Sequence, residues 1–285
     1  MSLSLLPEIR QGLRIFKAIS SKGGFWRDVS KAPDLIVDNL RIPKSHFSDV
    51  SIDTTFDPEK TLINDILESD INDTILTVGG DHSVSYFSTA AQIIRHGAEN
   101  TGLIWIDARP DLYTEDSSYT NNRNGMGVAG LMGLTKIWNN RLSRKYRLSP
   151  KNIVYIGTRD MDDVEMEILV KNNIKHYMSD EVKHYGSKLI TDKVLYEDLA
   201  HVNNVHVSFD VNVMDPPVFS CASYQYPHGL NFIETMALMK YLGMDSRVNS
   251  LDIVEFNPNF AVNEFRKEMC TNICTDIIKA TLRIF

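Results

Sequence analysis

The sequence lacks the features that mark several whole classes of protein. Cysteine is scarce: the 285 residues hold three, Cys221, Cys270 and Cys274, which cannot all pair within one chain and whose spacing resembles no zinc site. No apolar run approaches the roughly 20 residues that span a bilayer. The N-terminus also has no apolar segment after a basic start, as a secretory signal would. We therefore expect free thiols, no membrane partner and a cytoplasmic location.

Basic residues are also in short supply. Lys and Arg number 30 against 37 Asp and Glu, so the formal net charge is −7, which disfavours attraction to nucleic acid. No low-complexity linker, charge block or internal repeat divides the chain, and its 43% hydrophobic and 24% charged residues are ordinary for a globular protein. We expect a single domain over residues 1–285 and no nucleic-acid partner.

What the sequence does contain is an alternation of short β-rich runs with longer amphipathic segments, which is typical of a parallel sheet covered by helices. The expected strands are mostly continuous apolar runs, as where both sheet faces are buried: residues 74–78, 103–107, 152–156, 174–178, 205–210 and 250–254. The expected helices have apolar residues at helical spacing: residues 3–18, 83–96, 161–171, 232–242 and 263–282. Ser83 can cap the second of these helices.

Polar residues follow four of the expected strands. They lie at 79–83, 107–111, 210–212 and 255–258, and in a doubly wound sheet they would face one crevice beyond the carboxyl ends of the strands. Alternate residues of extended chain point the same way, so side chains at i and i+2 can converge on one ion. Carboxylates and an imidazole suit a divalent cation such as Mn²⁺, whereas the guanidinium of Arg109 does not.

These segments resemble the signatures of the ureohydrolase superfamily, which comprises arginases, agmatinases and formiminoglutamases. The family segments read GGDHS, DAHxD, SxDxDxxDP and SLDIVExNP; this chain has GGDHS at 79–83, DARPD at 107–111, SFDVNVMDP at 208–216 and SLDIVEFNP at 250–258. The match keeps the family's order and covers the chain from about residue 74. It implies a three-layer α/β/α fold with a mostly parallel sheet of about eight strands. Family members assemble as trimers or hexamers, and we expect a homotrimer.

The resemblance also implies a reaction and a metal centre. Family members hold two Mn²⁺ ions bridged by hydroxide, which attacks the guanidinium carbon of a substrate in arginine metabolism and releases urea or a related amide. Matched residue by residue, the ligands of the first ion are all present in this chain, and we call them the quartet: His82, Asp107, Asp111 and Asp210.

The second ion has lost both of the ligands that it does not share with the first. The family's His and Asp stand where this chain has Arg109 and Asn212. A guanidinium cannot deprotonate to bind a metal, but it can form a bidentate ion pair with a carboxylate. We therefore expect Arg109 to replace the second ion by pairing with a carboxylate of the quartet. This degenerate metal site predicts no bound metal, with one Mn²⁺ at the quartet as the alternative.

The substrate pocket is changed as well. Met126 replaces the family's proton-shuttling His, and a thioether serves neither as general acid nor as general base, so no catalytic residue is assigned. Three pocket candidates remain by resemblance: Asn124, Asp162 for the substrate amine, and Glu255 for its guanidinium. The family's small-residue loop after the DP pair is replaced by residues 220–228, which indicates a reshaped rim.

Three hypotheses for function follow. The leading one is an arginase-like pseudoenzyme that has lost the binuclear cluster and arginase activity and has a small-molecule-binding or regulatory role. The second is a mononuclear-metal hydrolase that cleaves a guanidino or formimino C–N bond with one ion at the quartet. The third is a binding module for a cationic small molecule such as arginine, ornithine or a polyamine, motivated by Asp162 and Glu255. The sequence does not identify the physiological ligand.

Overall fold

The computed structural model describes residues 12–42, 47–48, 58–137 and 143–284. Its centre is an eight-stranded sheet with the order β2-β1-β3-β8-β7-β4-β5-β6, in which every neighbouring pair is parallel. The strands are β1 (Leu13–Ala18), β2 (Phe47–Ser48), β3 (Thr74–Gly79), β4 (Thr101–Ile106), β5 (Ile153–Thr158), β6 (Lys175–Met178), β7 (Asn204–Asp210) and β8 (Val248–Val254).

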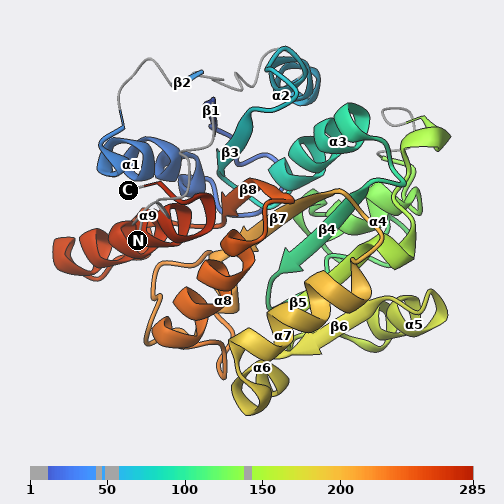
Figure 1. Ribbon diagram of the computed structural model, residues 1–285. Helices are drawn as coiled ribbons and strands as arrows, with labels where there is room; N and C mark the ends of the chain where they lie inside the picture. Colours follow the sequence, from blue (N-terminus) through green and yellow to red (C-terminus); the bar gives the residue numbers. More distant parts are fainter. Residues whose placement is uncertain (1–11, 43–46, 49–57, 138–142, 285) are drawn as a thin grey trace, which may run out of the picture.

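Helices cover both faces of this sheet, so the expected three-layer α/β/α fold is confirmed (Figure 1). One layer holds α1 (Ala32–Leu40), α6 (Ser179–Tyr185), α7 (Ser187–Lys193), α8 (Phe232–Met244) and α9 (Glu264–Leu282); the other holds α2 (Pro58–Leu67), α3 (Val84–His96), α4 (Gly127–Met132) and α5 (Asp163–Lys171). Each layer packs on the sheet through its own cluster of buried apolar side chains.

Apolar and polar residues alternate along β7, so one face of the strand makes apolar contacts and the other makes polar contacts. Its apolar residues belong to the core on the side of α8 and α9, whereas the alternate residues are polar and face α3. Ser208 Oγ donates to Ser85 Oγ at 2.9 Å, and His206 Nε2 lies 2.9 Å from Asp252 Oδ2. Burying these groups is tolerated because they bond to one another. The polar row continues along the strand to Asp210, at the carboxyl edge of the sheet.

Two local predictions are wrong. Residues 13–18 form strand β1 rather than the end of a helix over residues 3–18, because all six pair in parallel with β3. Pairing within the sheet outweighs the local helical spacing, and residues 3–11 lie outside the described residues. Ser83 is the residue before α3 but makes no side-chain cap hydrogen bond. Instead, Asp81 Oδ1 accepts the Ser83 N–H at 3.0 Å.

The other predicted elements are confirmed. All six expected strands and the remaining four expected helices are present, with ends that differ by up to two residues. The three cysteines are free thiols, as expected, and all are buried. Within the described part of the chain, no helix is long and apolar enough to cross a membrane.

Candidate metal centre

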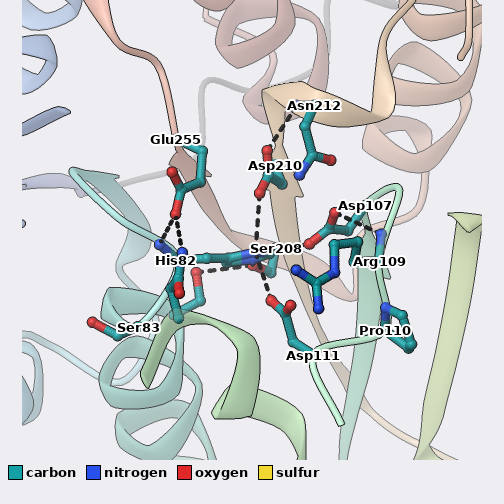
Figure 2. A network of polar contacts seen from close by, with 12 residues as sticks. His82, Ser83, Asp107, Arg109, Pro110, Asp111, Ser208, Asp210, Asn212 and Glu255 are labelled. Atoms are coloured by element: carbon teal, nitrogen blue, oxygen red, sulfur yellow. Dashed lines mark hydrogen bonds and ion pairs between the residues drawn. The ribbon is translucent and has the colours of Figure 1, made fainter. Parts of the chain in front are cut away.

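The quartet lies at the carboxyl edge of the sheet, where central strands end side by side. His82 follows β3 and Asp210 ends β7, while Asp107 and Asp111 follow β4. Strand β8 separates β3 from β7, and β4 is the next strand along. Because these strands are parallel, the residues that follow them meet at one edge. Each quartet residue is at most 4% exposed, and Figure 2 shows the carboxylates converging on the imidazole.

Four potential ligand atoms converge in this cluster. His82 Nδ1 lies 2.9 Å from Asp107 Oδ2, 3.1 Å from Asp111 Oδ2 and 3.3 Å from Asp210 Oδ2. Such spacings match the roughly 3 Å between ligand atoms that each lie about 2.1 Å from a shared ion. His82 Nδ1 is also buried without a hydrogen bond of good geometry to any described residue. His82, Asp107 and Asp111 have ligand atoms within 4.8 Å of one another, so these three residues fit a single divalent cation, and Asp210 Oδ2 faces the same imidazole nitrogen.

The imidazole of His82 is held in one orientation. Its ring stacks on Trp105, with centroids 4.0 Å apart and planes at 10°, and Nε2 lies 3.0 Å from Ser208 Oγ. Since Ser208 Oγ donates its own hydrogen to Ser85, it accepts one from Nε2. The lone pair is then on Nδ1, facing the three carboxylates. Four acceptors that face one another require a shared cation or a proton.

The pKa values of the quartet also indicate that its facing acceptor atoms require a proton or a cation. Burial alone would lower the pKa of His82, but the three surrounding carboxylates raise it well above its usual value. Burial and the charge of Asp107 raise the pKa of Asp111 to about 6 and that of Asp210 well above its usual value. Protons and a divalent ion therefore compete for the same atoms.

Arg109 does not pair with the quartet as the sequence predicted. Within the described residues its ion pairs join it to Asp160 and Glu165, with nitrogen–oxygen distances of 3.9 Å each. Its guanidinium carbon also lies 5.2 Å from the centroid of the Tyr113 ring. The prediction failed because the buried Glu165, on α5, offers a carboxylate that family matching did not reveal. Burial alone would lower the pKa of Arg109, but nearby negative charge raises it, so the group is a permanent cation.

Asn212 is committed to the protein backbone. Its Oδ1 accepts the Ala108 N–H at 3.0 Å, and its own N–H donates to Asp210 Oδ1 at 2.7 Å. The carboxamide therefore ties the turn after β7 to the loop after β4. Neither Arg109 nor Asn212 offers an anionic ligand atom.

Two of the pocket candidates, Asn124 and Glu255, bond to each other. Glu255 Oε1 accepts from Asn124 Nδ2 at 3.0 Å and from the His82 N–H at 2.9 Å. Burial and the charge of Asp81 raise the pKa of Glu255 to about 7. Met126, which the resemblance matched to a family His, is completely buried.

The third pocket candidate, Asp162, has both carboxylate oxygens engaged. Oδ1 caps α5 by accepting the Glu165 N–H at 3.0 Å, and Oδ2 accepts from the Tyr113 hydroxyl at 2.7 Å. Sequence reasoning missed Glu165, whose side chain is completely buried and whose Oε1 accepts the Leu112 N–H at 3.1 Å. Burial raises its pKa to about 8. The only sequence signal was Asp162 three positions before a glutamate, which is the spacing of an ordinary capping box.

Comparison with known proteins agrees with the fold and the motifs. The model of the arginase family matches residues 8–279. The arginase of Entamoeba histolytica is 30% identical over 193 residues, which cover 67% of this chain and 64% of that protein, slightly under two thirds of its length. The arginase of Staphylococcus aureus strain COL is 29% identical over 265 residues, 90% of this chain and 85% of that protein.

A solved structure shares the whole architecture. The crystal structure of Entamoeba histolytica arginase in complex with L-ornithine superposes with a TM-score of 0.86. The superposition covers 96% of this chain and 99% of that one, at 22% sequence identity.

Proposed function

Because the chain belongs to the arginase family, we propose that it keeps the fold and the first-ion site, lacks the second ion, and has lost arginase activity. The carrying observation is that Arg109 and Asn212 stand at the second ion's own ligand positions, where Asn212 is bonded to the backbone and Arg109 is a cation. We assign one Mn²⁺ to the quartet rather than none, because His82, Asp107 and Asp111 form a group able to hold an ion.

Further observations support the loss of the arginase reaction. A cationic guanidino substrate would approach the like charge of Arg109, and Met126 cannot carry protons. Asp162, expected to receive the substrate amine, already binds the Tyr113 hydroxyl and caps α5. A small-molecule-binding or regulatory role is consistent with these changes.

A second candidate function is hydrolysis of a C–N bond with one metal ion. When bound at the quartet, a divalent ion would activate water for attack on carbon. His82 would bind through Nδ1, with Ser208 fixing the tautomer. The specific observation in favour is Glu255, whose pKa of about 7 suits a group that takes up and releases protons near neutral pH. It accepts the His82 N–H and so lies beside the quartet.

The third hypothesis, a module that binds a cationic amino acid or polyamine, has weaker support. The ornithine complex is a property of the Entamoeba histolytica arginase. In this chain the two acidic residues that motivated the idea, Asp162 and Glu255, already have partners within the protein.

Three broader expectations are part of the proposal. Residues 1–285 would form one domain, since the clusters on both faces pack on the same sheet. By family resemblance the chain would assemble as a homotrimer. A cytoplasmic location follows from the sequence expectations alone.

Metal stoichiometry tests the proposal directly. The purified chain would be loaded with Mn²⁺, freed of unbound ion and analysed for metal, with urea release from arginine and agmatine measured on the same sample. We expect about one ion per chain and no urea. Two ions per chain, or rapid urea release, would contradict the loss of the second ion and of the reaction. No ion at all would contradict the assignment to the quartet.

A further inference from the structure

The first turn of α3 lies beside the quartet. Ser85 follows His82 by three positions, and the Ser85 N–H donates to the His82 carbonyl at 3.2 Å. Both residues are buried, and Ser85 is completely so. Residues three apart in a helical turn share one side of it, and the side chains of His82 and Ser85 contact the same residue of β7, Ser208.

These contacts form a closed ring of hydrogen bonds. His82 Nε2 lies 3.0 Å from Ser208 Oγ, Ser208 Oγ donates to Ser85 Oγ at 2.9 Å, and the Ser85 N–H returns to the His82 carbonyl. The ring therefore ties both the side chain and the backbone of His82 to α3 and β7. Rotation of the imidazole or of the Ser208 hydroxyl breaks one of its bonds.

The ring has a direction, because a hydroxyl has one hydrogen to donate. Ser208 gives its hydrogen to Ser85, so only its lone pairs face His82 Nε2, and the lone pair of Nδ1 faces the three carboxylates. Without an acceptor at position 85, the Ser208 hydroxyl is free to turn and donate to Nε2. Nδ1 would then carry the hydrogen of a neutral imidazole and oppose the ion.

A second buried serine on α3 belongs to a different set of contacts. Ser88 is completely buried as well, but its hydroxyl donates to Asp252 Oδ2, which also lies 2.9 Å from His206 Nε2. Its contact with Ser85 is to the backbone carbonyl, at 3.2 Å, and not to the hydroxyl. Ser88 therefore joins the polar group of His206 and Asp252 rather than the ring at His82.

From this geometry we infer that Ser85 is a positioning residue of the metal centre: by accepting the Ser208 hydrogen, it makes Ser208 an acceptor for His82 Nε2 and so presents Nδ1 to the ion. The inference deepens the proposed one-ion site and rests on it. Because Ser85 acts through Ser208, its contribution to Mn²⁺ affinity should vanish when the Ser208 hydroxyl is removed.

A double-mutant cycle on the full chain tests this dependence, with Mn²⁺ affinity measured by calorimetric titration. We expect Ser85→Ala to weaken Mn²⁺ binding about fivefold, but to have no further effect in a chain that already carries Ser208→Ala. Ser85→Thr keeps the acceptor oxygen and should bind Mn²⁺ within about twofold of the wild-type chain. Ser88→Ala is the matched control, since it removes a buried hydroxyl from the same helix and should leave the affinity unchanged.

Three results would overturn the inference: an unchanged affinity in Ser85→Ala, losses that add in the double variant, or a loss in Ser85→Thr equal to that in Ser85→Ala. Thermal denaturation of the metal-free variants separates a loss of folding stability from a loss of metal affinity. A wild-type chain that binds no Mn²⁺ would overturn the one-ion site together with this inference. Mn²⁺ binding that does not depend on Ser85 would overturn this inference alone.

Discussion

The site has two halves: the quartet around His82, and the neighbouring positions that include Asn212 and Asp162. The halves differ in whether their polar atoms have hydrogen-bond partners within the protein. Around His82, three carboxylate oxygens lie 2.9–3.3 Å from Nδ1, which is itself an acceptor. These four acceptors can lie so close together only if they share a proton or an ion. On the other half, Asn212 and Asp162 have partners within the protein. The buried His82 Nδ1 therefore lacks a protein hydrogen bond of good geometry among the described residues, whereas the side chains of Asn212 and Asp162 are committed to hydrogen bonds within the protein.

Removing a ligand from the first half should have the largest effect. We expect Asp210→Ala to weaken Mn²⁺ binding more than about 100-fold, since even residues that only orient a ligand can cost that much. Asn212→Ala is the matched control from the same turn and should change the affinity little. Metal analysis after dialysis measures both variants. Equal loss in the two would show that the halves do not differ as described.

Restoring the second half should change the stoichiometry. The double variant Arg109→His with Asn212→Asp removes the cation and supplies an imidazole and a carboxylate, so we expect the metal content to rise from about one ion per chain to about two. Each single variant should stay near one. If the double variant also binds one ion, the loss of the second ion does not depend on these two positions.

Weakening the support of His82 should have a smaller effect. Ser208→Ala removes the acceptor for Nε2, and we expect about tenfold weaker Mn²⁺ binding. Ser250→Ala is the matched control, because Ser250 lies on the adjacent strand β8 and bonds to His206 instead. Fluorescence or calorimetric titration with Mn²⁺ compares the variants, and identical affinities would remove Ser208 from the metal centre.

A change of pH should have the smallest of the expected effects, and that effect is on the folding stability of the metal-free chain. The folded pKa values of Asp111, Glu255 and Glu165 are about 6, 7 and 8, above their ordinary values. The folded chain therefore binds more protons than the unfolded chain between about pH 4 and pH 8, and its stability falls as pH rises through that window. His82 acts in the same direction, because its raised pKa stabilises the fold at low pH and this is lost above that pKa.

Thermal denaturation at two pH values measures this effect. We expect the Tm of the metal-free chain to be about 5 °C lower at pH 8 than at pH 6, and saturating Mn²⁺ to remove most of the difference by displacing the protons. A Tm that rises with pH in the metal-free chain would contradict the raised pKa values.

Much of the fold could be predicted because its signals are local. Most of the six predicted strands are short apolar runs, four of the six are followed by polar residues, and that pattern is visible without knowledge of their neighbours. The helical spacing of apolar residues over 3–18 hides strand β1, whose state depends on pairing with β3. The quartet residues are brought together because each follows or ends a parallel strand, so sheet topology alone carries them to one edge.

By itself, then, the sequence determined which chemical groups arrive at the carboxyl edge of the sheet, including an Arg and an Asn at positions 109 and 212. Only the tertiary structure decided which residues those groups contact. Arg109 pairs with Glu165 rather than with its sequence neighbours, and Asp162 binds Tyr113. The physical reason is that the partner of a long side chain depends on the distance and the burial of groups on separate segments. These distances and burials are set only when the helices pack on the sheet.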